Sequence, residues 1–200
     1  MLNEAAAIAP SLARILRGDW LLIGIGNDLR GDDAFGTILA RRLLREGFPA
    51  LDAGTCPENL TGPILAAAPD QLIFADAADM GAAVGTLCLL DPLEAPASSP
   101  STHDPGMGLL LAYLGERRKT STTILAVQLG TRALGEPMTA EVRESLNGLV
   151  ELFRRHRAGE RAPYGWGHPR PSDPSHTAAL RSTATPRATP VPGSPVVGRT

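Results

Sequence analysis

Hydrophobic residues along the chain gather into short runs of strand length, separated by longer segments in which apolar and polar residues alternate with helical spacing. Short, continuous apolar runs bounded by glycine, proline or charged residues are typical of buried strands. Spacings of three and four residues between apolar positions are typical of helices with one buried face. The pattern predicts strands over 20–26, 50–53, 71–76, 86–90 and 122–129, and helices over 4–16, 33–46, 58–68, 106–118 and 139–155.

Two of the predicted helices have well-defined apolar faces. In 139–155, Thr139 is a suitable N-cap, and the face to be buried comprises Val142, Leu146, Leu149, Val150 and Phe153. In 33–46 the corresponding positions are Phe35, Ile38, Leu39, Leu43 and Leu44. Pro63 is expected to shorten or offset the helix over 58–68.

Alternating strands and helices predict an α/β fold, a three-layer sandwich with a mostly parallel twisted sheet and helices on both faces. The connection between 71–76 and 86–90 is too short for a parallel crossover, so we expect that pair of strands to be antiparallel. Ligands of open α/β sheets bind beyond the carboxyl ends of the strands. The loops after Gly26, Ala53, Asp76 and Leu90 are therefore expected to form the functional edge.

Composition divides the 200 residues into a short lead at 1–19, one α/β domain at 20–156 and a tail at 157–200. The tail is rich in proline, serine, threonine and arginine and has no apolar periodicity, so we expect it to be disordered. A net charge of −2 gives no electrostatic drive toward nucleic acid. No apolar run is long enough to span a membrane and the amino terminus is a poor signal peptide, so we expect a cytoplasmic protein.

The most informative stretch is 21–36, LLIGIGNDLRGDDAFG, in which a buried strand leads through a glycine turn to two adjacent acids at a helix start. A third acid, Asp76, ends the predicted strand over 71–76, and His103 lies in the loop before the next helix. Two carboxylates and an imidazole suit a borderline divalent ion such as Ni²⁺, Zn²⁺ or Fe²⁺. The predicted site is therefore Asp33, Asp76 and His103, with Asp33 and Asp76 also available for acid–base chemistry.

Other interpretations of these residues stay open. Asp33 is also suited to interact with a helix dipole, Asp76 to end a strand, and His103 to face solvent. A dinucleotide-binding loop is disfavoured, because the last glycine of GxGxxG is replaced by Leu29 and acids would repel a pyrophosphate. The two cysteines form no CxxC motif, and there is no GxSxG elbow of a serine hydrolase.

Several motifs in order resemble those of the nickel-iron hydrogenase maturation endopeptidases, most closely the type that processes the hydrogenase 3 large subunit. IGNDLRGDDAFG is similar to the family's GNxxxxDDGxG loop and IFADAADMG to its DAxDMG strand end. DAGTCPEN, Thr102-His103, Gln128 and Pro137-Met138-Thr139 are similar to further family motifs. Departures include Ala53 for a glycine, Ala34-Phe35 for Gly-Ala, and Gly130-Thr131 where Pro-Asp is usual.

The resemblance implies that Asp33, Asp76 and His103 recognise nickel and that the protein removes a C-terminal extension from a [NiFe]-hydrogenase large-subunit precursor after nickel insertion. The nickel is carried by the substrate, and the protein holds no permanent metal. Such an enzyme is an aspartic-type or nickel-assisted endopeptidase, and which of Asp33 and Asp76 is the base stays open. We expect a monomer with no nucleic-acid or membrane partner. The alternative is a non-catalytic binding protein that checks nickel loading during hydrogenase assembly.

Overall fold

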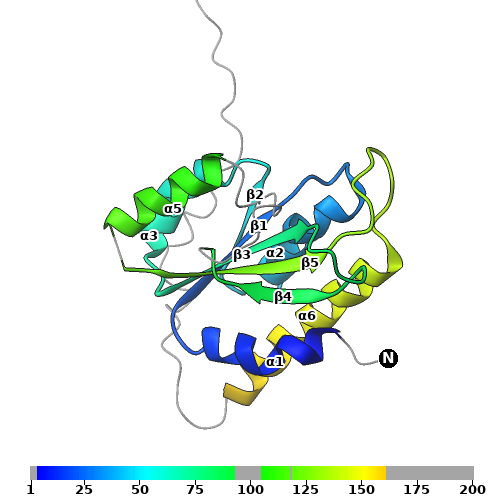
Figure 1. The fold of residues 1–200 in the computed structure, drawn as a ribbon. Coiled ribbons are helices and arrows are strands. Elements are labelled where there is room, and N and C mark those ends of the chain that lie inside the picture. Colours follow the sequence, from blue (N-terminus) through cyan, green and yellow to red (C-terminus); the bar gives the residue numbers. More distant parts are fainter. Residues whose placement is uncertain (1–3, 93–104, 118, 161–200) are drawn as a thin grey trace, which may run out of the picture. The chain divides into compact units, whose positions relative to one another are not determined.

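A computed structural model describes residues 4–92, 105–117 and 119–160, all within the first of two compact units, Met1–Trp166. Its centre is a five-stranded sheet with the order β2-β1-β3-β5-β4 (Figure 1). The strands are β1 (Trp20–Ile25), β2 (Ala50–Gly54), β3 (Gln71–Ala78), β4 (Leu87–Leu90) and β5 (Ser121–Gln128). All neighbours are parallel except β4 and β5. The expected α/β class, with a mostly parallel sheet, is confirmed.

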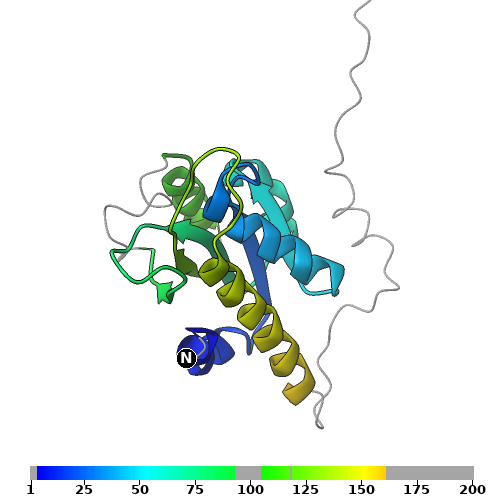
Figure 2. The same ribbon diagram turned by 90° about the vertical axis from the view of Figure 1, so that its right-hand side faces the viewer.

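Helices cover both faces of this sheet (Figures 1 and 2). On one face lie α1 (Glu4–Ile15), α2 (Phe35–Arg45) and α6 (Ala140–Glu160), and on the other lie α3 (Thr61–Ala67) and α5 (Pro105–Arg117). Two short 3₁₀ turns, η1 (Gly31–Ala34) and η2 (Pro57–Leu60), precede α2 and α3. Because successive strand side chains point to opposite faces, Ile73 joins the first core and Leu72 and Phe74 the second.

The two helices α2 and α6 bury the faces that their spacing predicts, except that Ile38 is half-buried and Leu44 is exposed. All five predicted positions of α6 are at most 1% exposed, and Phe35, Leu39 and Leu43 of α2 are fully buried. Leu44, by contrast, is 46% exposed, since it lies off the stripe that α2 turns to the sheet. Thr139 caps α6 as expected, with its hydroxyl accepting from the Val142 N–H at 3.4 Å.

The sheet differs from the sequence-based expectation in the place of β4. This strand is antiparallel, as its short connection requires, but it pairs with β5 and not with β3. The later strand β5 pairs in parallel with β3 over its whole length and so separates β3 from β4. As a result Leu90, the carboxyl end of β4, lies opposite Ile124 and away from the carboxyl end of β5. The expectation that the loop after Leu90 leaves from the functional edge was wrong.

Other boundaries shift by a few residues. The first turn of the predicted helix over 33–46 is the 3₁₀ turn η1, and α6 continues to Glu160. The tail was predicted to begin at 157, but residues 157–160 are the last residues of α6; the rest of the predicted tail, 161–200, lies outside the described residues, as does His103. Among the helices that the structure describes, none is long and apolar enough to cross a membrane.

Candidate active site

Four parallel strands end at one edge of the sheet, and the loops after β1 and β2 begin there. The loop after β1 turns back tightly because two glycines allow close backbone approach. A Cβ at Gly26, whose φ is +147°, would lie 1.8 Å from the Asp33 carbonyl oxygen. At Gly36 a Cβ would lie 2.1 Å from the Ala75 carbonyl oxygen. These contacts bring η1 and the start of α2 against the end of β3, one residue before Asp76.

The first acid of the Asp32-Asp33 pair is a structural clamp. Asp32 is fully buried, and its carboxylate accepts four hydrogen bonds from a distant part of the chain. One oxygen accepts from the N–H groups of Gly130 and Thr131 at 2.7 and 3.0 Å. The other accepts from the N–H and hydroxyl of Thr139 at 2.7 and 2.9 Å. Asp32 therefore fixes the loop between β5 and α6 to η1 and places a negative charge at the start of α6, where the helix dipole favours it.

Asp28, in the same loop, is engaged in an ion pair. Its carboxylate binds Arg41 of α2 and accepts a hydrogen bond from the Thr37 hydroxyl at 2.8 Å. Arg41 also binds Asp52 at the end of β2, with 2.5 Å between Nε and Oδ2. Partial burial acts to raise the pKa of Asp28, but the bonds from Arg41 and Thr37 and the guanidinium charge outweigh it, so the pKa lies below its usual value of 3.8. Asp28 is thus ionised and paired at neutral pH.

This pairing predicts a small acid-dependent loss of stability. Because the pKa is depressed in the folded protein, the stabilisation is present above the unfolded value of 3.8 and disappears as the pH falls through the lower folded value. We expect Asp28→Asn to be less stable than wild type by under about 1 kcal/mol at pH 6, since the pair is partly exposed. Urea unfolding of both proteins between pH 6 and pH 3 should show this difference shrinking, and a constant difference would contradict the assignment.

The second acid of the pair is left available. Asp33 is half-buried, and among the residues that the structure describes its carboxylate makes no hydrogen bond or ion pair. Asp76, on the neighbouring strand β3, is 5% exposed, and one of its oxygens accepts from the Ala77 N–H at 2.8 Å. Since η1 packs against β3, the elements that carry Asp33 and Asp76 are in contact at this edge. Of the three loop acids, Asp33 is the one suited to bind a ligand.

The third predicted residue, His103, lies outside the described residues, but its neighbour α5 is informative. Residues 118–120 alone connect α5 to β5, so the carboxyl end of α5 lies at the opposite edge, where β5 begins (Figure 1). The helix therefore runs back with its amino end, Pro105, toward the candidate edge, and α5 packs against η2 after β2. Within the described ranges no three His, Cys, Asp or Glu side chains are arranged to hold a metal.

Gln128, at the end of β5, organises the loop that follows β3. Its buried side-chain oxygen accepts from the N–H groups of Met80 and Ala82 at 2.6 and 3.2 Å. Its amide nitrogen donates to Asp79 at 3.1 Å and to the Leu129 carbonyl at 2.9 Å. The bond from Gln128, with one from the Gly81 N–H, lowers the pKa of Asp79. Sequence analysis singled out Gln128 by resemblance alone, since nothing local indicates that it binds residues nearly fifty positions earlier.

Replacing Gln128 should therefore destabilise the protein. Gln128→Leu removes the acceptor of two backbone N–H groups and both donated bonds, so we expect a loss of about 2–3 kcal/mol in the free energy of unfolding. Asp79→Asn is the matched control, because Asp79 is exposed, and it should cost less than about 1 kcal/mol. Urea unfolding measures both. Equal losses in the two variants would show that other contacts hold this loop.

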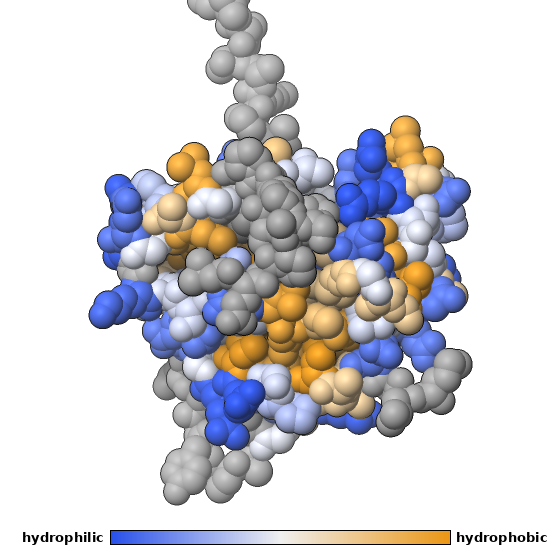
Figure 3. Space-filling view, viewed as in Figure 1, coloured by the Kyte–Doolittle hydropathy of each residue, from blue (hydrophilic) through white to orange (hydrophobic). Residues whose placement is uncertain are grey.

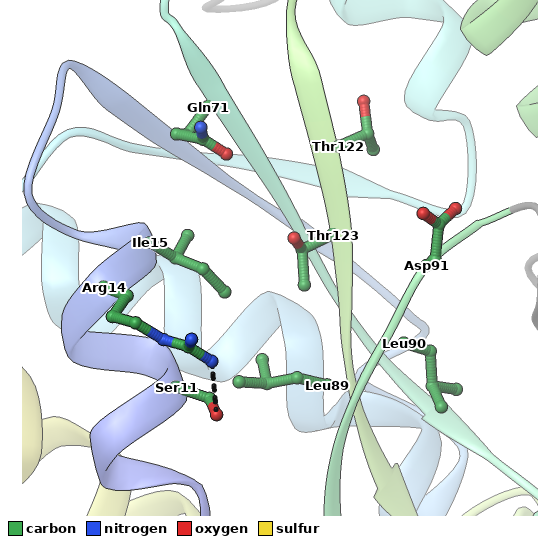
Figure 4. A pocket seen from close by; sticks show the side chains of 9 residues that line it. All are labelled: Ser11, Arg14, Ile15, Gln71, Leu89, Leu90, Asp91, Thr122 and Thr123. Carbon is green, nitrogen blue, oxygen red and sulfur yellow. Dashed lines mark hydrogen bonds between the residues drawn. The ribbon is translucent and has the colours of Figure 1, made fainter.

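An open cavity lies away from these acids, and a smaller one lies close to them. The first has a volume of about 500 Å³ and lies between α1 and β4, near the broad apolar area in Figure 3 and in close-up in Figure 4. Gln71 and Thr122, which line it, are at the amino ends of β3 and β5. The smaller cavity, about 300 Å³, lies at the candidate edge and is lined by Gly26, Asn27, Asp28, Thr37, Arg41, Gly54 and Thr55.

Comparison with known proteins agrees with this fold. A family model described as hydrogenase maturation protease matches residues 37–156. The match spans more than half of the chain and includes β2 to β5 and most of α6. The chain therefore belongs to the hydrogenase maturation protease family.

Individual relatives are similar over most of their own length. A hydrogenase 3 maturation protease of Escherichia coli K12 is 28% identical over 135 residues, which are 66% of this chain and 86% of that protein. The crystal structure of the [NiFe] hydrogenase maturation protease HycI of Thermococcus kodakarensis superposes with a TM-score of 0.65 at 31% identity, covering 73% of this chain and 97% of that one. For the solution structure of the E. coli endopeptidase HycI the TM-score is 0.60 at 25% identity, over 71% and 91%.

Proposed function

We propose that this protein is the endopeptidase that removes the C-terminal extension of a [NiFe]-hydrogenase large-subunit precursor after nickel has been inserted. The observation that carries the proposal is the state of Asp33. It is the loop acid without a partner in the described ranges, its 3₁₀ turn η1 packs against β3, the strand of Asp76, and it belongs to a chain of the hydrogenase maturation protease family. We further propose that the protein acts as a monomer in the cytoplasm.

In this proposal the nickel arrives bound to the precursor and contacts Asp33, Asp76 and His103. Carboxylate and imidazole ligands suit a borderline ion that is already held by the softer thiolates of the substrate. Docking of the ion places one peptide bond next to the two acids. One carboxylate, or a water molecule polarised by the nickel, then assists hydrolysis. The proposal leaves the role of base open between the two carboxylates.

Nickel dependence follows from the charges at this edge. Asp33 and Asp76 are both acids, and without a cation they repel each other and the carboxylates of an approaching chain. A nickel-loaded precursor supplies the missing positive charge, whereas an unloaded precursor does not. The same feature fits a second candidate function, a binding protein that checks nickel loading without cleaving the precursor.

Intact-mass spectrometry of the co-encoded large-subunit precursor, mixed with the protein with and without prior nickel loading, separates these functions. We expect loss of a C-terminal peptide in the nickel-loaded sample alone. Binding without cleavage in the loaded sample would favour the checking protein. Cleavage in both samples would retain the peptidase but remove nickel from its mechanism.

A further inference from the structure

Two strongly exposed leucines lie side by side at the candidate edge, on loops far apart in the sequence. Leu29, in the loop after β1, is 65% exposed, and Leu134, in the loop between β5 and α6, is 71% exposed. The N–H of Gly135 donates to the carbonyl of Leu29 at 2.8 Å, which joins the two loops at these residues. Both loops run together at the upper right of Figure 1, where Figure 3 shows apolar side chains among hydrophilic ones.

Hydrogen bonds fix the backbone of the two loops that carry Leu29 and Leu134. The side-chain oxygen of Asn27 accepts from the Leu29 N–H at 3.0 Å. On the other loop, Glu136 accepts from the Thr131 hydroxyl at 2.8 Å through its side chain and from the Gly31 N–H at 3.1 Å through its carbonyl. The clamp at Asp32 fixes the base of the same loop. The exposure of Leu29 and Leu134 is therefore built into the structure of both loops.

The leucine pair is continuous with the proposed site. The Arg30 carbonyl accepts from the Asp33 N–H at 3.0 Å, so Leu29 and Asp33 flank one tight turn. Of the six exposed large hydrophobic residues in the described ranges, three are at this edge, because Val84 lies against Gly130 at the base of the second loop. Apolar surface gathered beside an active site marks a place where a partner binds.

We propose that Leu29 and Leu134 form a docking platform for an apolar side chain of the polypeptide substrate, next to the segment that is cleaved. This inference rests on the proposed function and extends it, since it names a contact that does not involve nickel. The occupant is a protein substrate because the platform adjoins Asp33, where the chain to be cleaved has to lie. A second copy of this protein fits less well, since stable dimers bury about 1,600 Å² in total and two leucines contribute little of that.

The test compares Leu29→Ser/Leu134→Ser with wild type, and uses Leu44→Ser as the control. Leu44 is also exposed, but it lies in the last turn of α2, at the far end from the candidate edge. Binding and cleavage of the nickel-loaded precursor are measured over a range of precursor concentrations. We expect the double variant to raise the Kd and the KM by about tenfold. The rate at saturation should stay within about threefold of wild type, since no group at the nickel is changed.

Each outcome decides between the two proposals. Unchanged Kd and KM in the double variant, or an equal change in Leu44→Ser, would overturn the platform. If wild type binds the precursor but cleaves none, the proposed function fails, and the binding comparison still decides the platform. If wild type sediments as a dimer and the double variant as a monomer, the occupant of the platform is a second copy of this protein, and the proposal of a substrate platform is wrong.

Discussion

Asp33→Asn is expected to abolish processing while leaving the fold intact. The amide has the size of the carboxylate but lacks its negative charge and its ability to accept a proton. Because the Asp33 carboxylate has no partner in the described ranges, no hydrogen bond there is lost. Loss of a general base or of a charged ligand costs a factor of about 10² to 10⁴ in rate. Single-turnover cleavage of the nickel-loaded precursor, followed by intact mass, should fall by at least about 100-fold.

A matched control for this experiment is present in the same loop. Asp28→Asn makes the same chemical change three residues before η1 begins, at an acid that is already paired with Arg41. It should retain cleavage within a few-fold of wild type, and both variants should melt close to the wild-type temperature. Full activity of Asp33→Asn would remove Asp33 from the mechanism. Equal losses in both variants would show that the charge of the loop as a whole matters, and not one carboxylate.

Asp32→Ala is expected to cause a large loss of stability. The substitution leaves the N–H groups of Gly130, Thr131 and Thr139 without their acceptor and removes the charge at the start of α6. Hydrogen bonds to a charged group contribute more than neutral ones, and several are lost together. We expect the free energy of unfolding to fall by about 3–5 kcal/mol, a large part of the stability of a domain of this size.

Urea unfolding measures this loss, and Asp33→Ala is the comparison because it changes the adjacent acid. Its cost should be within about 1 kcal/mol, as for most substitutions that break no contact. Asp32→Ala should therefore lower mainly the stability of the protein, and Asp33→Ala mainly its rate of cleavage. A stability loss below about 1 kcal/mol for Asp32→Ala would contradict the clamp.

The sequence predicts the strands and the main helices well because their apolar runs are bounded by clear breaks. It does not predict the partner of β4. A short connection settles the direction of a strand, whereas its neighbour depends on β5, which comes more than thirty residues later. The length of the connection therefore correctly predicts that β4 is antiparallel, but it wrongly predicts that β4 pairs with β3.

The two adjacent acids show a second limit of sequence reasoning. In the sequence Asp32 and Asp33 are equivalent, and Asp33 is selected by its place in the predicted layout. Their different environments come from Thr139, 107 positions after Asp32, whose N–H and hydroxyl bind only the first of the pair. Asp33 and Asp76 could be proposed because the sequence places one after a buried strand and the other near the end of one, but the bonds that separate a clamp from an available acid form only in the folded chain.

The clamp at Asp32 also sets the order in which the protein becomes competent during synthesis. The first strand and its acidic loop leave the ribosome early, but the groups that fix this loop belong to residues 130–139. Chains are synthesised from the amino terminus at about 5–20 residues per second, so residues 130–139 follow the acidic loop by several seconds. A nascent chain that ends before residue 130 contains Asp33 and Asp76 but lacks the groups that fix the loop. The acidic loop is therefore fixed only after residues 130–139 have been made.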